Sequence, residues 1–123
     1  MPNPVTHWEI TSKNPKKLWN YYSDLFGWQV QDVHMPGMDY GLVDTKEKQG
    51  ANGGIGGGQG PNRVMFYVEV PDVDAMLKKA EQMGGKVIMK PDTIPGMVRL
   101  AQFADPDGNV IGLVHNLAPQ QPR

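Results

Sequence analysis

Apolar and polar residues alternate over residues 5–10 and again over residues 64–70. A period of two predicts a strand with one buried face in each half of the chain. In the first strand Trp8 and Ile10 share the apolar face. The opposite faces of the two strands carry Val5, His7 and Glu9, and Met65, Tyr67 and Glu69, respectively.

A helical period follows each of these strands, over residues 15–26 and 73–83. Asn14 precedes Pro15, which is a capping side chain followed by the residue that best fits the first helical position. Asp72 predicts the cap of the second helix. The expected helix ends are glycines, at Gly27 and at Gly84–Gly85.

Further extended segments are expected at residues 28–30, 40–43, 86–89, 98–103 and 110–114. The last two flank Asp105-Pro106-Asp107-Gly108-Asn109, a turn sequence that predicts a hairpin. Seven glycines between residues 50 and 60 predict a loop, with at most a brief strand at Ile55. A plain flexible connector is the simplest interpretation of this loop. It lacks the G-x-G-x-x-G spacing of a phosphate cradle.

The two halves match when they are offset by 58 residues. The offset superposes strand, cap, helix face, stop glycine and following strand, for example Trp8 on Phe66 and Gly27 on Gly85. We therefore predict an α+β fold in which one domain, residues 1–123, holds two βαβββ repeats at about 5–57 and 63–115. Two such units form a half-open mixed β-sheet trough with the helices on its outer face. The trough is the expected place for a ligand.

The composition limits the classes of partner that the chain is expected to bind. Twelve basic and thirteen acidic side chains give a net charge of −1, so nothing draws the chain to nucleic acid or to an acidic membrane. There is no cysteine, which excludes disulfides and thiolate metal sites. No apolar run approaches the roughly 18 to 20 residues that span a bilayer, and the first residues lack the parts of a signal peptide. We expect a cytoplasmic location.

Four segments together carry a family resemblance. They are His7-Trp8-Glu9-Ile10, Leu25-Phe26-Gly27-Trp28, Tyr67-Val68-Glu69-Val70 with the Asp72-Val73-Asp74 that follows, and Asp105-Pro106-Asp107-Gly108-Asn109. In order and spacing they resemble the vicinal oxygen chelate superfamily, the group of glyoxalase I, bleomycin resistance proteins and extradiol dioxygenases. The resemblance covers residues 5–115 and implies paired βαβββ modules around a cavity, often completed in a homodimer. It also places the glycine-rich loop at the mouth of that cavity, where a lid is the functional alternative to a connector. It does not imply one reaction.

The resemblance also locates the metal ligands of the metal-dependent members. The first-strand histidine falls on His7, the matching residue of the second half on Met65, and the last-strand glutamate on Gly112. A thioether is a poor ligand for such ions and glycine has no side chain, so we expect no metal and no other cofactor. A displaced site using His7, Glu9, Glu69 or His115 is the alternative.

The residues expected to bind a ligand are His7, Met65, Tyr67, Glu69 and Gly112, joined by Arg99 and Phe103 if the hairpin pairs Ala101 with Gly112. A one-residue bulge would reverse the placement of the last two. His7 with Glu9 or Glu69 is the candidate acid–base pair. Each of these candidate residues also has a simpler structural interpretation. His7 is then a hydrogen-bonded structural histidine, the two glutamates lie in solvent at strand ends, and Tyr67 forms a wall of the cavity.

Two functions follow. The first is a homodimeric small-molecule binding protein of the bleomycin-resistance type, without the usual metal, that takes an antibiotic or metabolite. The second is an enzyme of the same superfamily, either lyase, isomerase or dioxygenase-like, that uses His7 with Glu9 or Glu69 or relocated metal ligands. A third hypothesis is that the protein is a non-catalytic subunit or a regulator.

Overall fold

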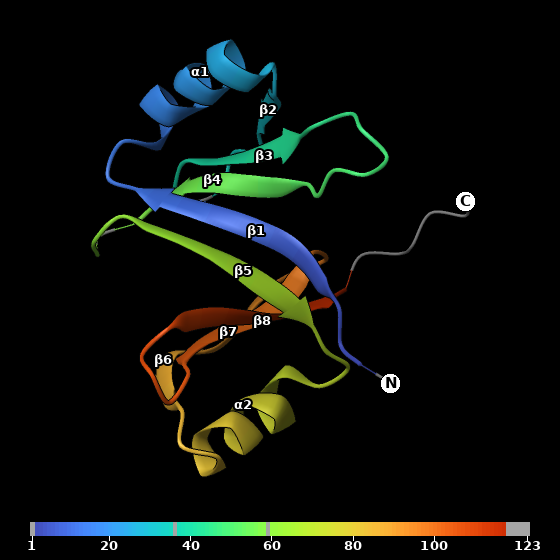
Figure 1. Cartoon of the computed structure of the whole chain (residues 1–123), viewed down its shortest axis with the longest axis vertical. Coiled ribbons are helices and arrows are strands. Elements are labelled where there is room, and N and C mark those ends of the chain that lie inside the picture. The colour runs from blue at the N-terminus through green and yellow to red at the C-terminus, as the bar shows by residue number, and fades with distance from the viewer. Residues whose placement is uncertain (1, 36, 59, 118–123) are drawn as a thin grey trace. The chain divides into compact units, whose positions relative to one another are not determined.

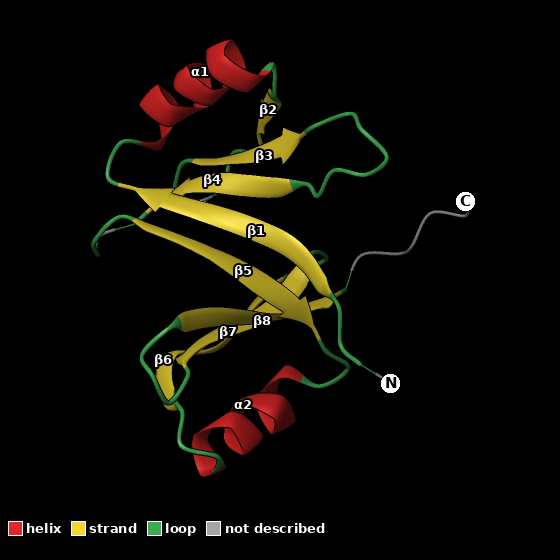
Figure 2. Cartoon of the chain, viewed as in Figure 1, coloured by secondary structure: helices red, strands yellow, loops and turns green. Residues whose placement is uncertain are grey.

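The computed structural model describes residues 2–35, 37–58 and 60–117. Its elements in chain order are β1 (Val5–Ser12), α1 (Pro15–Phe26), β2 (Gln29–Asp32), β3 (Tyr40–Asp44), β4 (Gly53–Gly57), β5 (Arg63–Glu69), α2 (Val73–Gln82), β6 (Lys86–Ile94), β7 (Val98–Ala104) and β8 (Val110–Asn116). Figures 1 and 2 show these helices and strands. This order is βαβββ twice, which confirms the α+β class and the predicted repeat.

The chain divides into two compact units, which we call the N-terminal unit (Thr6–Phe66) and the C-terminal unit (Met1–Val5 with Tyr67–Arg123). Strand order in the first is β2-β3-β4-β1, and in the second β5-β8-β7-β6. The β1–β4 and β5–β8 pairs are parallel, and the other pairs within each unit are antiparallel. Whether the units make one domain, and whether they form the trough, stay predictions.

The registers of the two parallel pairs confirm the 58-residue offset. Glu9 pairs with Gly54, and Tyr67 pairs with Gly112. The same offset relates Ile10 and Ile55 to Val68 and Leu113. The repeat therefore extends into the final strand of each unit.

The N-terminal unit corrects the sequence analysis at its glycine-rich segment. Residues 53–57 are not loop but strand β4, which lies between β3 and β1 and is almost wholly buried. The reason is aromatic packing: a Cβ at Gly53 would overlap the Trp8 ring, and a Cβ at Gly54 or Gly56 would overlap the ring of Tyr40. Glycine is thus needed so that neighbouring aromatic side chains can lie across the strand. A lid function for this segment is wrong, because its backbone is paired on both sides.

Helix α1 begins with Pro15 and ends at Gly27, whose φ of 73° is left-handed as predicted. The expected side-chain cap at Asn14 is wrong. Instead, the backbone N–H of Asn14 donates to Ser12 Oγ at 3.1 Å. Helix α1 contacts β2, β3 and β4, and Trp19 Nε1 donates to the Ile55 carbonyl at 2.9 Å.

The C-terminal unit packs α2 on one face of its four strands (Figure 2). The buried core is made by Val70, Val73, Leu77, Ala101 and Leu113. Asp72 caps α2 as predicted, accepting the N–H of Ala75 at 3.0 Å. Strand β6 is longer than expected and contains Pro91, which a strand at the edge of the sheet tolerates. None of the helices within the described ranges has both the length and the apolar character that crossing a membrane requires.

The β7–β8 hairpin corrects the predicted register by one residue. Gln102, and not Ala101, pairs with Gly112. The turn sets this register: Asp105 N–H donates to the Asn109 carbonyl at 2.8 Å, and the Asp105 carboxylate accepts from the N–H groups of Asp107 and Asn109. A turn closed in this way makes Ala104 and Val110 the last pair.

Candidate functional site

Three side chains of the N-terminal unit form a hydrogen-bonded chain. Tyr40 Oη donates to Glu9 Oε2 at 3.0 Å and lies 3.0 Å from His7 Nε2. His7 and Glu9 are on β1, whereas Tyr40 is on β3, and β4 runs between the two strands. Tyr40 can reach them because Gly54 and Gly56 leave the surface of β4 bare. The two glycines are therefore needed for the position of the Tyr40 hydroxyl as well as for the packing of β4.

The direction of these hydrogen bonds fixes the proton on His7. Since Tyr40 has one hydroxyl proton and gives it to Glu9, its oxygen accepts from His7 Nε2–H. Burial lowers the pKa of His7, which keeps the imidazole neutral near pH 7. His7 is therefore the Nε2–H tautomer, and Nδ1 is its basic nitrogen.

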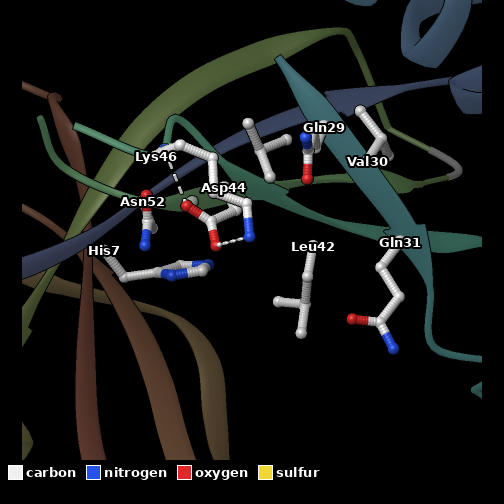
Figure 3. A pocket seen from close by; sticks show the side chains of 10 residues that line it. His7, Gln29, Val30, Gln31, Leu42, Asp44, Lys46 and Asn52 are labelled. Atoms are coloured by element: carbon white, nitrogen blue, oxygen red, sulfur yellow. Dashed lines mark hydrogen bonds and ion pairs between the residues drawn. The ribbon is translucent and has the colours of Figure 1, made fainter.

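A cavity of about 350 Å³ opens beside His7 in the same unit. Its wall combines amide, charged and apolar side chains, from Gln29, Val30, Gln31, Leu42, Val43, Asp44, Lys46, Asn52 and Gly53. In Figure 3 the His7 imidazole extends toward Leu42, with Asp44 and Asn52 along one side of the opening. The volume lies within the roughly 300 to 1,000 Å³ of small-molecule sites.

The loop after β3 holds the charged part of this wall in place. Lys46 has a left-handed φ of 60°, and its backbone N–H donates to Asp44 Oδ1 at 2.8 Å. The Lys46 ammonium lies 3.4 Å from Asp44 Oδ2. The backbone hydrogen bond from Lys46 is the main cause that lowers the pKa of Asp44. Asn52 Oδ1 accepts the N–H of Thr45 at 3.1 Å.

The positions that match metal ligands in the superfamily do not fit a metal ion. Met65 is a buried thioether, and a Cβ at Gly112 would overlap the ring of Tyr67, so the space where a ligand side chain would begin is filled. His7 Nε2 is engaged with Tyr40. Within residues 2–35, 37–58 and 60–117, no three His, Asp or Glu side chains are grouped so that they could hold an ion.

In the C-terminal unit the predicted residues Tyr67 and Gly112 lie together. The Tyr67 ring covers Gly112, and Gln102 Nε2 donates to Tyr67 Oη at 3.0 Å. This is the counterpart of Tyr40 lying across Gly54. Tyr67 is only 3% exposed, and it lines neither the cavity beside His7 nor a second cavity beneath α2, so its role as a wall of a ligand site stays a prediction.

Glu69 is held at the end of β5 by its own unit. Its Oε2 accepts the Asn116 N–H at 3.3 Å and lies 3.2 Å from His115 Nδ1. His115 Nδ1 also lies 3.0 Å from the Val70 carbonyl, which can only accept, so Nδ1 carries a proton. Of the two glutamates proposed as partners of His7, Glu9 is the one that the hydrogen bonds of a single unit join to it.

Arg99 and Phe103 were expected to bind a ligand only if Ala101 paired with Gly112, and the structure does not have that register. Because Gln102 pairs with Gly112, both residues lie on the opposite face of the hairpin, where α2 packs. Arg99 donates from Nε and Nη2 to the two carboxylate oxygens of Asp74 on α2, at 2.6 and 2.8 Å. Phe103 packs against the core. Their placement with Gly112 is wrong.

Sequence reasoning missed Tyr40, Leu42 and the glutamines of β2. Residues 40–43 were correctly expected to be extended, but nothing connected Tyr40 to His7. The signal was present in the glycines at 54 and 56, whose spacing of two leaves one face of a strand bare.

Residues 5–113 match the Glyoxalase/Bleomycin resistance protein/Dioxygenase superfamily. Together with the repeated βαβββ fold, this match shows that the chain belongs to that superfamily. The anthracycline biosynthesis protein DnrV of Streptomyces peucetius is 31% identical over 123 residues, covering 87% of this chain and 45% of DnrV. The chain thus spans less than half the length of that relative.

Two solved structures share the fold at low identity. Methylmalonyl-CoA epimerase from Mycobacterium tuberculosis has a TM-score of 0.69 at 16% identity, over 94% of this chain and 88% of that one. The hypothetical protein BH1468 from Bacillus halodurans has a TM-score of 0.71 at 11% identity, over 100% and 99%. At these identities the similarity concerns the fold alone.

Proposed function

We propose that the chain binds a small organic molecule, an antibiotic or metabolite, in the cavity beside His7, without the metal ion of the metal-dependent superfamily members. One observation carries the proposal: the His7–Tyr40–Glu9 chain of hydrogen bonds ends at a cavity of ligand size. The misfit of Met65 and Gly112 to a metal ion supports the metal-free part.

The lining favours a ligand that combines apolar surface with hydroxyl or carbonyl groups. Leu42 and Val30 offer apolar contact, while Gln29, Gln31 and Asn52 offer both donors and acceptors. The protein DnrV, which is named for anthracycline biosynthesis, suggests a hydroxylated polycyclic aromatic molecule as a first candidate.

Acid–base catalysis is the second candidate, and the same hydrogen bonds favour it. His7 Nδ1 would take a proton from the substrate, and the Tyr40 hydroxyl with the Glu9 carboxylate would stabilise the imidazolium that forms. Burial keeps His7 neutral and therefore able to accept a proton.

Fluorescence titration with doxorubicin, an anthracycline with intrinsic emission, tests the site. We expect saturable binding that His7→Ala weakens severalfold. His34→Ala is the matched control, because the His34 side chain is 86% exposed outside the cavity, and it should bind like the wild type. Equal binding by His7→Ala would place the ligand elsewhere.

Two further measurements separate the candidates. Mass spectrometry of doxorubicin after prolonged incubation should return unchanged ligand if the protein only binds it. A product that disappears in His7→Ala would favour the enzyme. Metal analysis of the purified protein should give far less than one equivalent of iron, zinc or nickel, and one tightly held equivalent would refute the metal-free part.

A further inference from the structure

The C-terminal unit contains a second cavity, on the face of its strands that α2 covers. It measures about 440 Å³, and its wall is mainly apolar. The strands contribute Val68, Val70, Phe103 and Leu113, the helix contributes Met76, Lys79, Ala80 and Met83, and Asn3, Gly85, Asp105 and Pro106 complete the rim. None of the residues that line the cavity beside His7 belongs to it, whereas Phe103, one of the ligand-binding residues predicted from the sequence, does.

The internal repeat points to one residue that distinguishes this cavity from the first unit. In the N-terminal unit, the region near the end of α1 is filled by rings: Tyr22 stacks on Trp28 at 5.4 Å and on Phe26 at 5.9 Å. The 58-residue offset places Ala80, Gly84 and Lys86 at these three positions. Of these three, Ala80 lines the cavity, so the second unit has a methyl group there where the first has the Tyr22 ring. We therefore expect this part of the cavity to accept an aromatic ring.

Charge at the rim favours an anion. Lys79 lines the cavity and, among the residues that the structure describes, takes part in no ion pair. The Asp105 carboxylate also lies at the rim, but it accepts the N–H groups of Asp107 and Asn109 and the Asn109 side-chain amide. These hydrogen bonds direct the Asp105 oxygens into their own turn and lower the pKa of the group, which therefore stays ionised. The anionic part of a ligand is expected at Lys79 and away from Asp105.

We propose that the cavity beneath α2 is a second binding site, which takes a flat aromatic molecule carrying one negative charge. The rings occupy the space between Ala80 and the strands, and the anionic group lies at Lys79. The site is independent of the cavity beside His7, so either proposal can fail without the other.

Two dyes with nearly the same rings test both parts. They are 1-anilinonaphthalene-8-sulfonate, which carries a sulfonate, and N-phenyl-1-naphthylamine, which is uncharged. We expect the wild type to bind both with enhanced fluorescence. Ala80→Tyr, which restores the residue found at Tyr22, should weaken both at least tenfold. Lys79→Gln should weaken only the sulfonate, about threefold or more.

Glu81→Tyr is the matched control, because it adds the same ring at an exposed position of α2 outside the cavity. It should bind both dyes within twofold of the wild type. If Ala80→Tyr does not fold, Met83→Trp replaces it: Met83 lines the cavity but is 70% exposed, so a larger side chain there is tolerated.

Three outcomes would overturn the proposal. The wild type fails to bind either dye, or the filled variant binds them as tightly as the wild type. The third is that Ala80→Tyr converts a dimer into a monomer, which would make the cavity an interface between two copies. A selective loss of the sulfonate dye in Lys79→Gln supports the assigned charge, and equal affinity refutes it.

Discussion

Replacing Gly54 by alanine should disrupt the hydrogen bonds that join His7, Tyr40 and Glu9, although none of these three residues is itself substituted. A Cβ at this position would lie 2.5 Å from Tyr40 Cε1 and would overlap the hydroxyl as well. Either the ring stays and the contact is strained, or the ring moves and leaves His7 and Glu9. Gly56 confines the ring further, because it lies against the same side chain.

The two outcomes overlap in magnitude. Overpacking a filled site costs about 1 to 3 kcal/mol. Losing the hydrogen bond to the Glu9 carboxylate costs about 1.5 to 3 kcal/mol, and losing the one to His7 adds about 0.5 to 1.5 kcal/mol. The protein takes the cheaper route, so we expect Gly54→Ala to lower the free energy of unfolding by about 2 kcal/mol or somewhat more. At this chain length that corresponds to a melting temperature lower by roughly 6 to 15 °C.

Urea unfolding and calorimetry of Gly54→Ala and Gly60→Ala measure the effect. Gly60→Ala is the matched control, since a Cβ there would meet nothing within 4 Å. It should be neutral, or more stable by up to about 1 kcal/mol, because alanine restricts the unfolded chain. In a Tyr40→Leu background, Gly54→Ala should cost about 1 kcal/mol less than it does in the wild type. Equal costs in the two backgrounds would refute the reasoning.

Three other predictions concern pH and assembly. The folded state lowers the pKa of His7, so the contribution of its neutral form to stability is complete above pH 6.5 and is lost as the pH falls from 6.5 through the folded value. His7→Gln should therefore reduce the pH dependence of the free energy of unfolding, measured in urea, over that range. An unchanged slope would count against a buried neutral imidazole. The hydrogen bond from Arg99 lowers the pKa of Asp74, so stability should fall as the pH drops below 3.8, and thermal melts of Asp74→Asn should show a weaker acid dependence. We also expect a homodimer in sedimentation equilibrium, because α1 exposes the apolar side chains of Tyr21, Leu25 and Phe26. Leu25→Asp should weaken the dimer. A wild type that stays monomeric at micromolar concentration would contradict the expectation.

The repeat and its helices could be predicted because local rules govern them. Alternation, helical spacing and Gly27 at a left-handed position act over a few residues, and the structure follows them. The β4 strand was anticipated only as a brief strand at Ile55, which lies at its centre. Its full extent could not be predicted from its own residues, because glycine has low strand propensity and the cause lies in Trp8 and Tyr40 on neighbouring strands.

The candidate site was predicted only in part, for the same reason. His7 and Glu9 were expected to share a face of β1, but the hydroxyl between them comes from Tyr40, 31 residues beyond Glu9 in sequence. Arg99 was misplaced by a single step of register, because a five-residue turn can close in more than one way and its closure depends on the hydrogen bonds of Asp105.

The Tyr67 ring over Gly112 constrains how the sequence can change with time. A glutamate introduced at 112 would collide with that ring, so the substitution is harmful unless residue 67 has already become smaller. Shrinking Tyr67 first removes the acceptor of the Gln102 amide and opens a hole in a position that is now 3% exposed. Each single step is disfavoured, so an ion-binding carboxylate at position 112 is difficult to acquire one substitution at a time while Tyr67 is present.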